Sequence, residues 1–426
     1  MSQEAIWAIA LFLITYAFIV AEKIHRTIVA MAGGLLMVLF GIVDQETALH
    51  HISFNTLGLL TGMMIIVAIT ADTGLFKFIA VWAAKKSRGN PVKILVSLSL
   101  ITAVGSAFLD NVTTVLLIVP VTFSITKQLN VSPIPFLVSE ILMANIGGTA
   151  TLIGDPPNIM IGSAVPELSF MDFIVNLSPV IFVIFIVTTA LLILLYRKQI
   201  QTTKEAQKNI MDLDEKQEIT DSALLVKCLI VLGLTVVGFF LHQILHLESA
   251  TVALAGAFLL LLLAGESHLE KALERVEWPT IFFFIGLFAL VAGLAETGVL
   301  KQVASLSMEW TGGNLTMMSM FVLWISAIAS AFVDNIPFVA TMIPMIKEMG
   351  TLGIENLEPL WWSLALGACL GGNGTLIGAS ANVIVAGLAS NEGYKLSFIK
   401  YMLVGLPMML LSIVIATVYV YFRYLI

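Results

Sequence analysis

The segment Ser106-Ala-Phe-Leu-Asp-Asn111 returns 224 residues later as Ser330-Ala-Phe-Val-Asp-Asn335. A second segment, Gly147-Gly-Thr-Ala-Thr-Leu-Ile-Gly154, returns at the same spacing as Gly371-Gly-Asn-Gly-Thr-Leu-Ile-Gly378. Each copy places an aspartate, asparagines and threonines inside apolar sequence, where unpaired polar groups are costly. The sequence therefore predicts a duplicated unit with a polar binding site at matching positions.

The composition is typical of a polytopic membrane protein. The 426 residues are 59% hydrophobic and 12% charged, with a mean hydropathy of +1.00, whereas soluble domains carry about 25% charged residues. We therefore expect an all-α protein embedded in a lipid bilayer. Apolar runs long enough to cross a hydrocarbon core of about 30 Å lie near residues 5–22, 27–44, 57–71, 172–196, 223–246, 250–264, 279–295 and 400–422.

A polar linker at 197–222 divides the chain into a first repeat, 1–196, and a second repeat, 223–426. Each repeat should contain about five transmembrane helices, together with one re-entrant hairpin that turns at Asp-Asn and one helix that breaks at the glycine pair. An odd number of crossings would invert the second repeat relative to the first. The expected hairpins lie at about 93–127 and 316–350, and the expected broken helices at about 136–165 and 361–390.

The basic residues predict the orientation. If the N-terminus is outside, all 21 Lys and Arg residues except Lys301, Lys347 and Arg423 lie on the cytoplasmic side, as the positive-inside rule requires. We therefore expect a cytoplasmic linker at 197–222 and both termini outside.

The hairpin turns carry the first set of candidate binding residues. Asp and Asn are favoured helix N-caps, so each pair could simply cap the helix that follows, but capping and binding can coexist. A carboxylate at the same place in both repeats favours binding. The candidates at the two turns are Asp110, Asn111, Thr113, Asp334 and Asn335.

The helix breaks carry the second set. A broken helix exposes carbonyl groups at one half-helix end and N–H groups at the other, which suit cations and anions respectively; the alternative is a kink used only for packing. The candidate substrate- or ion-binding residues at the breaks are Asn145, Thr149, Thr151, Asp155, Asn158, Asn373, Thr375, Ser380 and Asn382. A sodium ion would take its ligands from Asp110, Asn111, Thr149, Thr151 and Asp155.

Two acidic residues of the first predicted broken helix have no acidic counterpart in the second repeat. Asp155 aligns with Ala379, so the first repeat carries an additional carboxylate and is the better candidate for ion coupling. Glu140 aligns with Leu364 and is a second candidate for proton coupling, although a water-filled vestibule near the membrane face would equally accommodate it.

The sequence contains no nucleophile elbow, phosphate loop or HExxH zinc motif. We therefore expect no enzymatic activity, no cofactor and no nucleic-acid partner. The energy for transport would come from an ion gradient or from the gradient of the substrate itself.

Four segments resemble the ion transporter superfamily: Phe108-Leu-Asp-Asn-Val-Thr-Thr-Val-Leu-Leu117, Asn145-Ile-Gly-Gly-Thr-Ala-Thr-Leu-Ile-Gly-Asp-Pro-Pro-Asn158, Phe332-Val-Asp-Asn-Ile-Pro-Phe338 and Gly367-Ala-Cys-Leu-Gly-Gly-Asn-Gly-Thr-Leu-Ile-Gly-Ala-Ser-Ala-Asn382. They are most similar to its branch of arsenite permeases, NhaD-type sodium/proton antiporters, the melanosomal P protein and CitM-like permeases. The resemblance implies a transport domain built from hairpins and broken helices, a scaffold that forms a homodimer, elevator-type alternating access and a bacterial cytoplasmic membrane.

The acidic turns favour a cation as the transported or coupled species. Asp110, Asp155 and Asp334 would place up to three negative charges near one cavity, which cations or protons must neutralise. Dicarboxylate-transporting relatives usually carry Ser-Asn-Thr where this chain has Asp-Asn. The leading hypothesis is a secondary active transporter coupled to sodium or protons, either a sodium/proton antiporter or an arsenite efflux protein. The alternative is a transporter or channel for citrate, a dicarboxylate or chloride.

Overall fold

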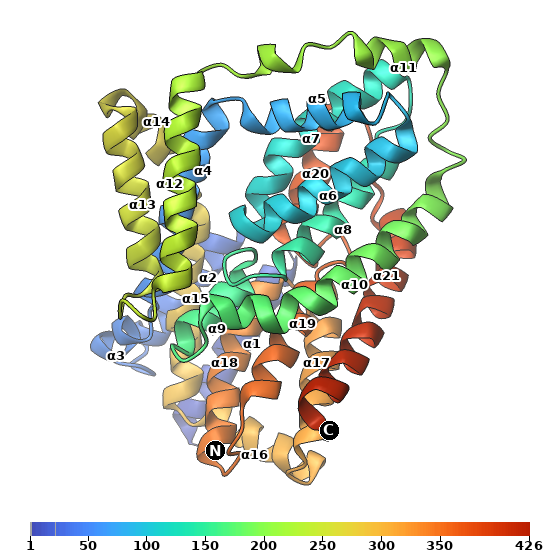
Figure 1. The fold of residues 1–426 in the computed structure, drawn as a ribbon. Helices are drawn as coiled ribbons and strands as arrows, with labels where there is room; N and C mark the ends of the chain where they lie inside the picture. Colours follow the sequence, from blue (N-terminus) through green and yellow to red (C-terminus); the bar gives the residue numbers. More distant parts are fainter. Residues whose placement is uncertain (1, 22) are drawn as a thin grey trace.

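The computed structural model describes residues 2–21 and 23–426, and the regular secondary structure of these residues is helical (Figure 1). The helices of the first repeat are α1 (Gln3–Ala21), α2 (Arg26–Leu39), α3 (Gln45–His50), α4 (Phe54–Asp72), α5 (Leu75–Lys86), α6 (Pro91–Leu109), α7 (Asn111–Leu129), α8 (Ile134–Gly148), α9 (Pro156–Ala164) and α10 (Phe170–Tyr196). The linker contains α11 (Lys204–Met211) and η1 (Glu215–Glu218).

The second repeat contains the same series of long helices in the same order. They are α12 (Ser222–Leu241), α13 (Ser249–Ala264), η2 (Glu266–His268), α14 (Leu269–Glu274), α15 (Trp278–Glu296), α16 (Val299–Thr311), α17 (Leu315–Phe332), α18 (Asn335–Thr351), α19 (Glu358–Gly371), α20 (Ser380–Asn391), α21 (Phe398–Val420) and η3 (Tyr421–Leu425). Helix α15 begins 224 residues after α4 begins and ends 224 residues after α4 ends, which is the spacing of the repeated motifs. The duplication therefore extends to the secondary structure.

Nine helices in the described ranges are long and apolar enough to cross a membrane: α1, α4, α6, α7, α10, α12, α15, α17 and α21 with its continuation to Leu425. The predicted all-α fold is thus confirmed. Most of the eight predicted apolar runs agree with a helix to within a few residues. The run at 223–246 is an exception, because α12 ends at Leu241 and residues 242–248 form the turn into α13.

The helices of the first hairpin are longer than a re-entrant hairpin that reaches only the middle of the membrane requires. Asp110 alone separates α6 from α7, and each of these helices has 19 residues, which corresponds to about 28 Å. This length suits a full crossing as well as a hairpin, so the re-entrant assignment of 93–127 stays a prediction. The second hairpin turns at Val333 and Asp334, between α17 and α18.

Two short helices, α5 and α16, were not predicted from the sequence. Each follows a glycine with positive φ, Gly74 at 79° and Gly298 at 73°, which turns the chain sharply away from the preceding span. The two helices lie at opposite ends of the molecule (Figure 1). The linker packs on α5, where Lys85 donates a hydrogen bond to the carbonyl of Leu213 (2.7 Å) and pairs with Glu215. The hydrogen bond from Lys85 holds the pKa of Glu215 below its ordinary value.

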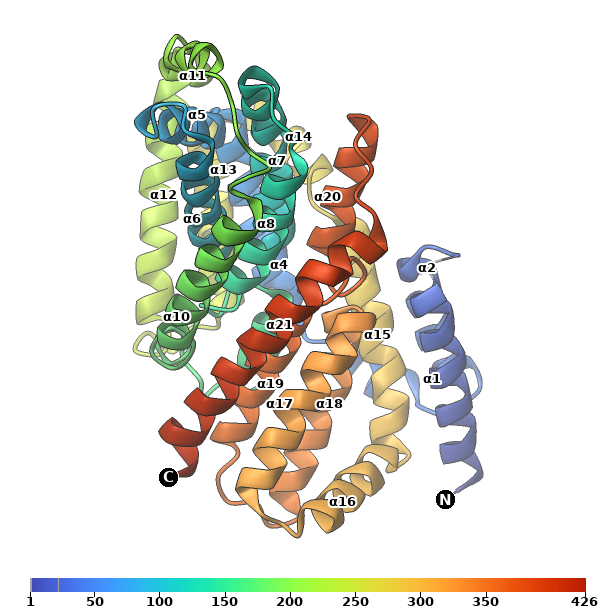
Figure 2. The ribbon, with the colours of Figure 1, turned by 90° about the vertical axis from the view of Figure 1, so that its right-hand side faces the viewer.

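Helices α1 and α2 lie on the side of the molecule opposite α12 and α13 (Figure 2). Between these groups, α6 packs against α8 and α17 packs against α19. The same hydrogen bond fixes both pairs: Ser106 donates to the carbonyl of Ala144 and Ser330 donates to that of Ala368, each at 2.6 Å. These two helix pairs hold the broken segments in place.

Glycine permits the close approach of α8 to α6 and of α19 to α17. A Cβ on Gly147 would overlap the carbonyl oxygen of Ala103, and one on Gly371 would lie 2.6 Å from that of Ala327. Backbone atoms cannot rotate out of the way as a flexible side chain can. Only glycine therefore fits at these two crossings.

We predict that Gly147→Ala destabilises the protein by about 1–3 kcal/mol, the usual cost of overpacking. The apparent thermal midpoint in detergent should fall accordingly. Gly233→Ala is the matched control, because Gly233 lies within α12 and a Cβ added there would meet no atom within 4 Å, while alanine favours helix. Equal midpoints for the two variants would contradict the packing argument.

Candidate functional site

The two helix breaks are closed by the same asparagine arrangement. Between α8 and α9, Asn158 donates through Nδ2 to the carbonyls of Thr149 (3.1 Å) and Thr151 (2.8 Å). Between α19 and α20, Asn382 donates to the carbonyls of Gly372 (2.7 Å) and Thr375 (2.9 Å). The side-chain amides thus replace backbone hydrogen bonds that the interrupted helices cannot make.

The threonine hydroxyls of the breaks are also engaged. Thr149 donates to the carbonyl of Asn145 (2.6 Å), Thr151 to that of Ala107, and Thr375 to that of Ala331 (2.5 Å). Each hydroxyl therefore ties the extended segment to its own helix or to the first arm of the adjacent hairpin. A sodium site that uses the hydroxyls of Thr149 and Thr151 would have to compete with these hydrogen bonds.

Asn145 joins the two repeats at the centre of the protein. Its Nδ2 donates to Oδ1 of Asn373 (2.9 Å) and of Asn382 (3.0 Å), and its Oδ1 accepts from Asn111 (3.1 Å). All four side chains are buried. One network thereby connects the hairpin turn of the first repeat to both helix breaks.

The two hairpin turns differ in their backbone. Asp110 has φ 94° and ψ 158°, a region that is essentially reserved for glycine and costs about 1–3 kcal/mol for other residues. Its carboxylate accepts from Thr113 N (2.8 Å) and Thr113 Oγ1 (2.6 Å), which caps α7 as expected from the sequence. Asp334 has an ordinary φ of −47°. Of the two hairpin turns, the one in the first repeat is therefore the strained one.

A small inner cavity of about 20 Å³ lies between the first hairpin turn and the breaks, which is room for about one water-sized species. Asp155 lines it and is fully buried. Its Oδ1 accepts from Asn335 (3.3 Å), whereas its Oδ2 has no hydrogen-bond partner among the described residues. The other lining residues are Arg26, Leu60, Met64, Asp110, Asn111, Val112, Pro156, Glu277, Thr280, Asn335, Ile336 and Ser380.

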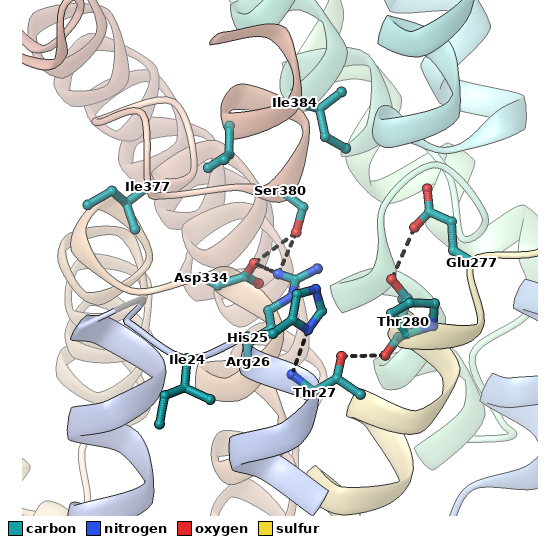
Figure 3. A pocket seen from close by; sticks show the side chains of 12 residues that line it. Ile24, His25, Arg26, Thr27, Glu277, Thr280, Asp334, Ile377, Ser380 and Ile384 are labelled. Atoms are coloured by element: carbon teal, nitrogen blue, oxygen red, sulfur yellow. Dashed lines mark hydrogen bonds and ion pairs between the residues drawn. The ribbon is translucent and has the colours of Figure 1, made fainter. Parts of the chain in front are cut away.

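A larger outer cavity of about 440 Å³ adjoins the inner one. In Figure 3 the guanidinium of Arg26 points toward Asp334 and Ser380. It pairs with Asp334 and donates to Ser380 Oγ (2.7 Å), and Ser380 donates to Asp334 Oδ2 (2.9 Å). Glu277 lies across the cavity and accepts from Thr280 (3.0 Å).

The sequence did not identify Arg26 and Glu277 as site residues. Duplication marks polar positions that both repeats share, but the place of Arg26 is held by Ser249 or Ala250 in the second repeat and that of Glu277 by Ser53 in the first. The repeat pattern therefore carried no signal for either residue. Their positions just before a span indicated only a membrane face.

The predicted residues fall into three groups. Asp110, Asn111, Asp155, Asn335 and Ser380 meet at the inner cavity. Asp334 lines the outer cavity, and Thr113 lines a third cavity of about 270 Å³ that also contains Glu277. The remaining predicted residues are buried in the network around the breaks: Asn145, Thr149, Thr151, Asn158, Asn373, Thr375 and Asn382.

Glu140 lies apart from the inner and outer cavities. It is fully buried on α8, accepts a hydrogen bond from Thr122 Oγ1 (2.5 Å), and its Oε2 has no partner among the described residues. The structure therefore does not place Glu140 in an open vestibule, and its role in proton coupling stays a prediction.

Comparison with known proteins identifies the family of this chain. The family model described as "CitMHS: Citrate transporter" matches residues 16–367. The chain belongs to this citrate transporter family. It is an integral membrane transporter, and the resemblance to the ion transporter superfamily is confirmed.

Several relatives of this citrate transporter family member cover nearly all of it. A "46 kDa membrane protein" of Mycobacterium leprae is 40% identical over 98% of this chain and 99% of its own length. An "uncharacterized transporter" of Mycobacterium tuberculosis is 41% identical over 99% of both chains. The human P protein is 37% identical over 95% of this chain, which spans 58% of the P protein.

A solved structure supports the fold. The Alcanivorax borkumensis YdaH transporter superposes with a TM-score of 0.59 over 98% of both chains, at 14% sequence identity. At that identity the likeness concerns the fold alone.

We predict that Asn145→Ala lowers stability more than Asn176→Ala does. The first change leaves the buried Oδ1 atoms of Asn373 and Asn382 without donors, at about 1–3 kcal/mol for each unsatisfied group. Asn176 is buried as well, but its Oδ1 accepts from Arg423 (3.0 Å) and Tyr424 (2.7 Å). Neither of these donors is buried, so water can take the place of Asn176 as their acceptor. Thermal midpoints in detergent measure both effects, and a larger fall for Asn176→Ala would refute the central role of Asn145.

Proposed function

We propose that this protein is a secondary active transporter that moves a small ion or solute by alternating access, coupled to sodium or protons. The observation that carries the proposal is Asp155, a fully buried carboxyl group with one oxygen left without a partner among the described residues, beside a cavity of about 20 Å³. A buried carboxylate without compensation is costly. A dehydrated sodium ion or a proton would remove that cost.

The charge of the site favours a cation or a neutral solute over an anion. Asp110, Asp155 and Glu277 line the inner cavity, and Arg26 is the one basic residue among its lining side chains in the described part of the chain. That guanidinium already pairs with Asp334. We therefore place sodium/proton antiport and arsenite efflux ahead of anion transport.

Citrate or another anion is the second candidate. Arg26 faces an outer cavity of about 440 Å³, within the range of small-molecule pockets, and guanidinium groups suit carboxylates. The description of the matching family as citrate transporters points the same way. An anion would have to displace Asp334 from Arg26.

Paired cavities support alternating access. A cavity of about 400 Å³ is lined by residues 242–243 and 246–249 of the α12–α13 connection, together with Asn55, Leu152 and Gly162. The α12–α13 connection corresponds to the α1–α2 connection of the outer cavity, and Asn55 corresponds to Pro279. The outer cavity shares lining residues with the inner cavity, whereas the cavity at the α12–α13 connection shares none with it. We take the pair as two vestibules, one of which adjoins the site in this state.

Inverted repeats and elevator motion are part of the proposal. The opposite positions of α5 and α16 in Figure 1 support inversion. The walls of the inner cavity support relative motion, because Leu60 and Met64 come from α4, whereas Asp155 and Ser380 come from the broken helices. We further propose a homodimeric scaffold and a cytoplasmic linker in a bacterial cytoplasmic membrane.

We predict that Asp155→Asn and Asp110→Asn abolish transport by removing the cation-binding charges. Proteoliposomes that contain a pH dye are challenged in turn with sodium, lithium, arsenite, chloride and citrate. The signal of both variants should fall to that of protein-free liposomes, while Asp214→Asn, a change to a carboxylate of the linker, should retain it. A pH response to sodium supports antiport. Wild-type flux from Asp155→Asn would exclude the proposed site.

Glu140→Gln separates the two candidates for the coupled proton. The substitution keeps the shape of the side chain and an oxygen that accepts from Thr122, but it cannot release a proton. If Glu140 carries the coupled proton, radioactive sodium should still enter proteoliposomes while the accompanying pH change disappears. An unchanged ratio of protons to sodium would instead leave Asp155 as the carrier.

A further inference from the structure

The inner and outer cavities meet at a wall made by four residues. Arg26, Glu277, Thr280 and Ser380 line both spaces. Of these side chains, Arg26 is the longest and the only one that makes an ion pair among the described residues. It therefore lies at the passage, the boundary where the outer cavity meets the inner cavity that Asp110 and Asp155 line.

Three contacts hold the guanidinium in that passage. It pairs with Asp334, donates to Ser380 Oγ (2.7 Å) and lies over the ring of Phe283 at 5.0 Å from the centroid. Charge-assisted hydrogen bonds are stronger than neutral ones, and the face of an aromatic ring attracts a cation. The side chain is thus fixed rather than freely mobile, although 26% of it remains exposed.

The contacts also join two groups of helices. Arg26 starts α2 and Phe283 belongs to α15. Asp334 forms the turn between α17 and α18, and Ser380 starts α20 after the second break. Closing the passage therefore links the helices around α2 and α15 to the second hairpin and the second broken helix.

We propose that Arg26 is the gate between the outer vestibule and the inner ion cavity, closed by its ion pair with Asp334. What the gate admits rests on the proposed function, whereas the closure itself does not. An inner cavity of about 20 Å³ holds one small species, so an ion there is enclosed while the pair is intact. An entering cation competes with the guanidinium for Asp334, since one carboxylate cannot neutralise both.

Leu60→Cys provides a reporter of the closed state. Leu60 lies on α4, is 4% exposed and lines the inner cavity but not the outer one. Methyl methanethiosulfonate is small and uncharged, so its access does not depend on the charge of the gate. Peptide mass spectrometry distinguishes the introduced thiol from Cys228 and Cys369, the two native cysteines, which are both buried.

In the Leu60→Cys background, Arg26→Ala should accelerate modification by at least about tenfold, because hydrogen bonds to charged groups that hold the gate shut are lost. Asp334→Asn removes the other partner of the ion pair and should accelerate the modification as well. The double variant should add little to either, as expected for two partners in one interaction. Monodisperse elution and a retained thermal transition establish folding, and Asp334→Asn tests the gate if Arg26→Ala fails to fold.

Arg275→Ala is the matched control. Arg275 pairs with Asp72 and donates to the carbonyl of Ala68 (3.1 Å), outside the inner cavity. It should leave the modification rate unchanged. Equal rates with arginine or alanine at position 26, or equal acceleration by Arg275→Ala, would overturn the gate.

The same reporter separates the gate from the proposed function. In Arg26→Ala, sodium or lithium should slow modification relative to choline if a cation binds between Asp110 and Asp155. Acceleration by Arg26→Ala without protection by either ion would support the gate and contradict cation binding. Protection by sodium without any acceleration by Arg26→Ala would support cation binding and contradict the gate.

Discussion

The structure depends on satisfying polar backbone and side-chain groups where two helices are interrupted inside apolar surroundings. With no water to bind them, free carbonyl and N–H groups are costly at membrane depth. Asn158 and Asn382 close the two breaks, Thr151 and Thr375 tie them to the hairpins, and Asn145 joins them. Much of the polarity that marks these segments in the sequence therefore serves to hold the breaks in a defined shape.

The two repeats contribute different charges to the candidate site. The first repeat has a strained Asp110 and an additional carboxyl group at Asp155, whereas the second has an unstrained Asp334 paired with Arg26. Two similar half-sites thus differ in charge and in backbone strain. The first has unsatisfied acceptor capacity among the described residues, and the second is already neutralised by the chain's own cation.

The sequence predicted the fold well where the pattern was strong. Long apolar runs located α1, α4, α10, α15 and α21, and glycine pairs located both breaks. The hydrophobic pattern did not predict α5 and α16, because these short helices carry lysines and too few apolar residues to form a span. At the site, duplication found Asp110, Asn111 and Asn335 but gave no sign of Arg26 and Glu277, whose charges are not repeated in the other half. Nor can a linear pattern tell a threonine that binds a ligand from one that binds a carbonyl.

The hydrogen bonds from Asn145 to Asn373 and Asn382 bear on the number of binding sites per chain. Two copies of a unit would ordinarily suggest two independent binding sites, each occupied separately. Because a single amide group bonds to both repeats, either half can rearrange alone only by breaking buried hydrogen bonds. Under the proposed function, the duplication supplies two walls of one compartment, and the expected stoichiometric unit is the whole chain rather than the repeat.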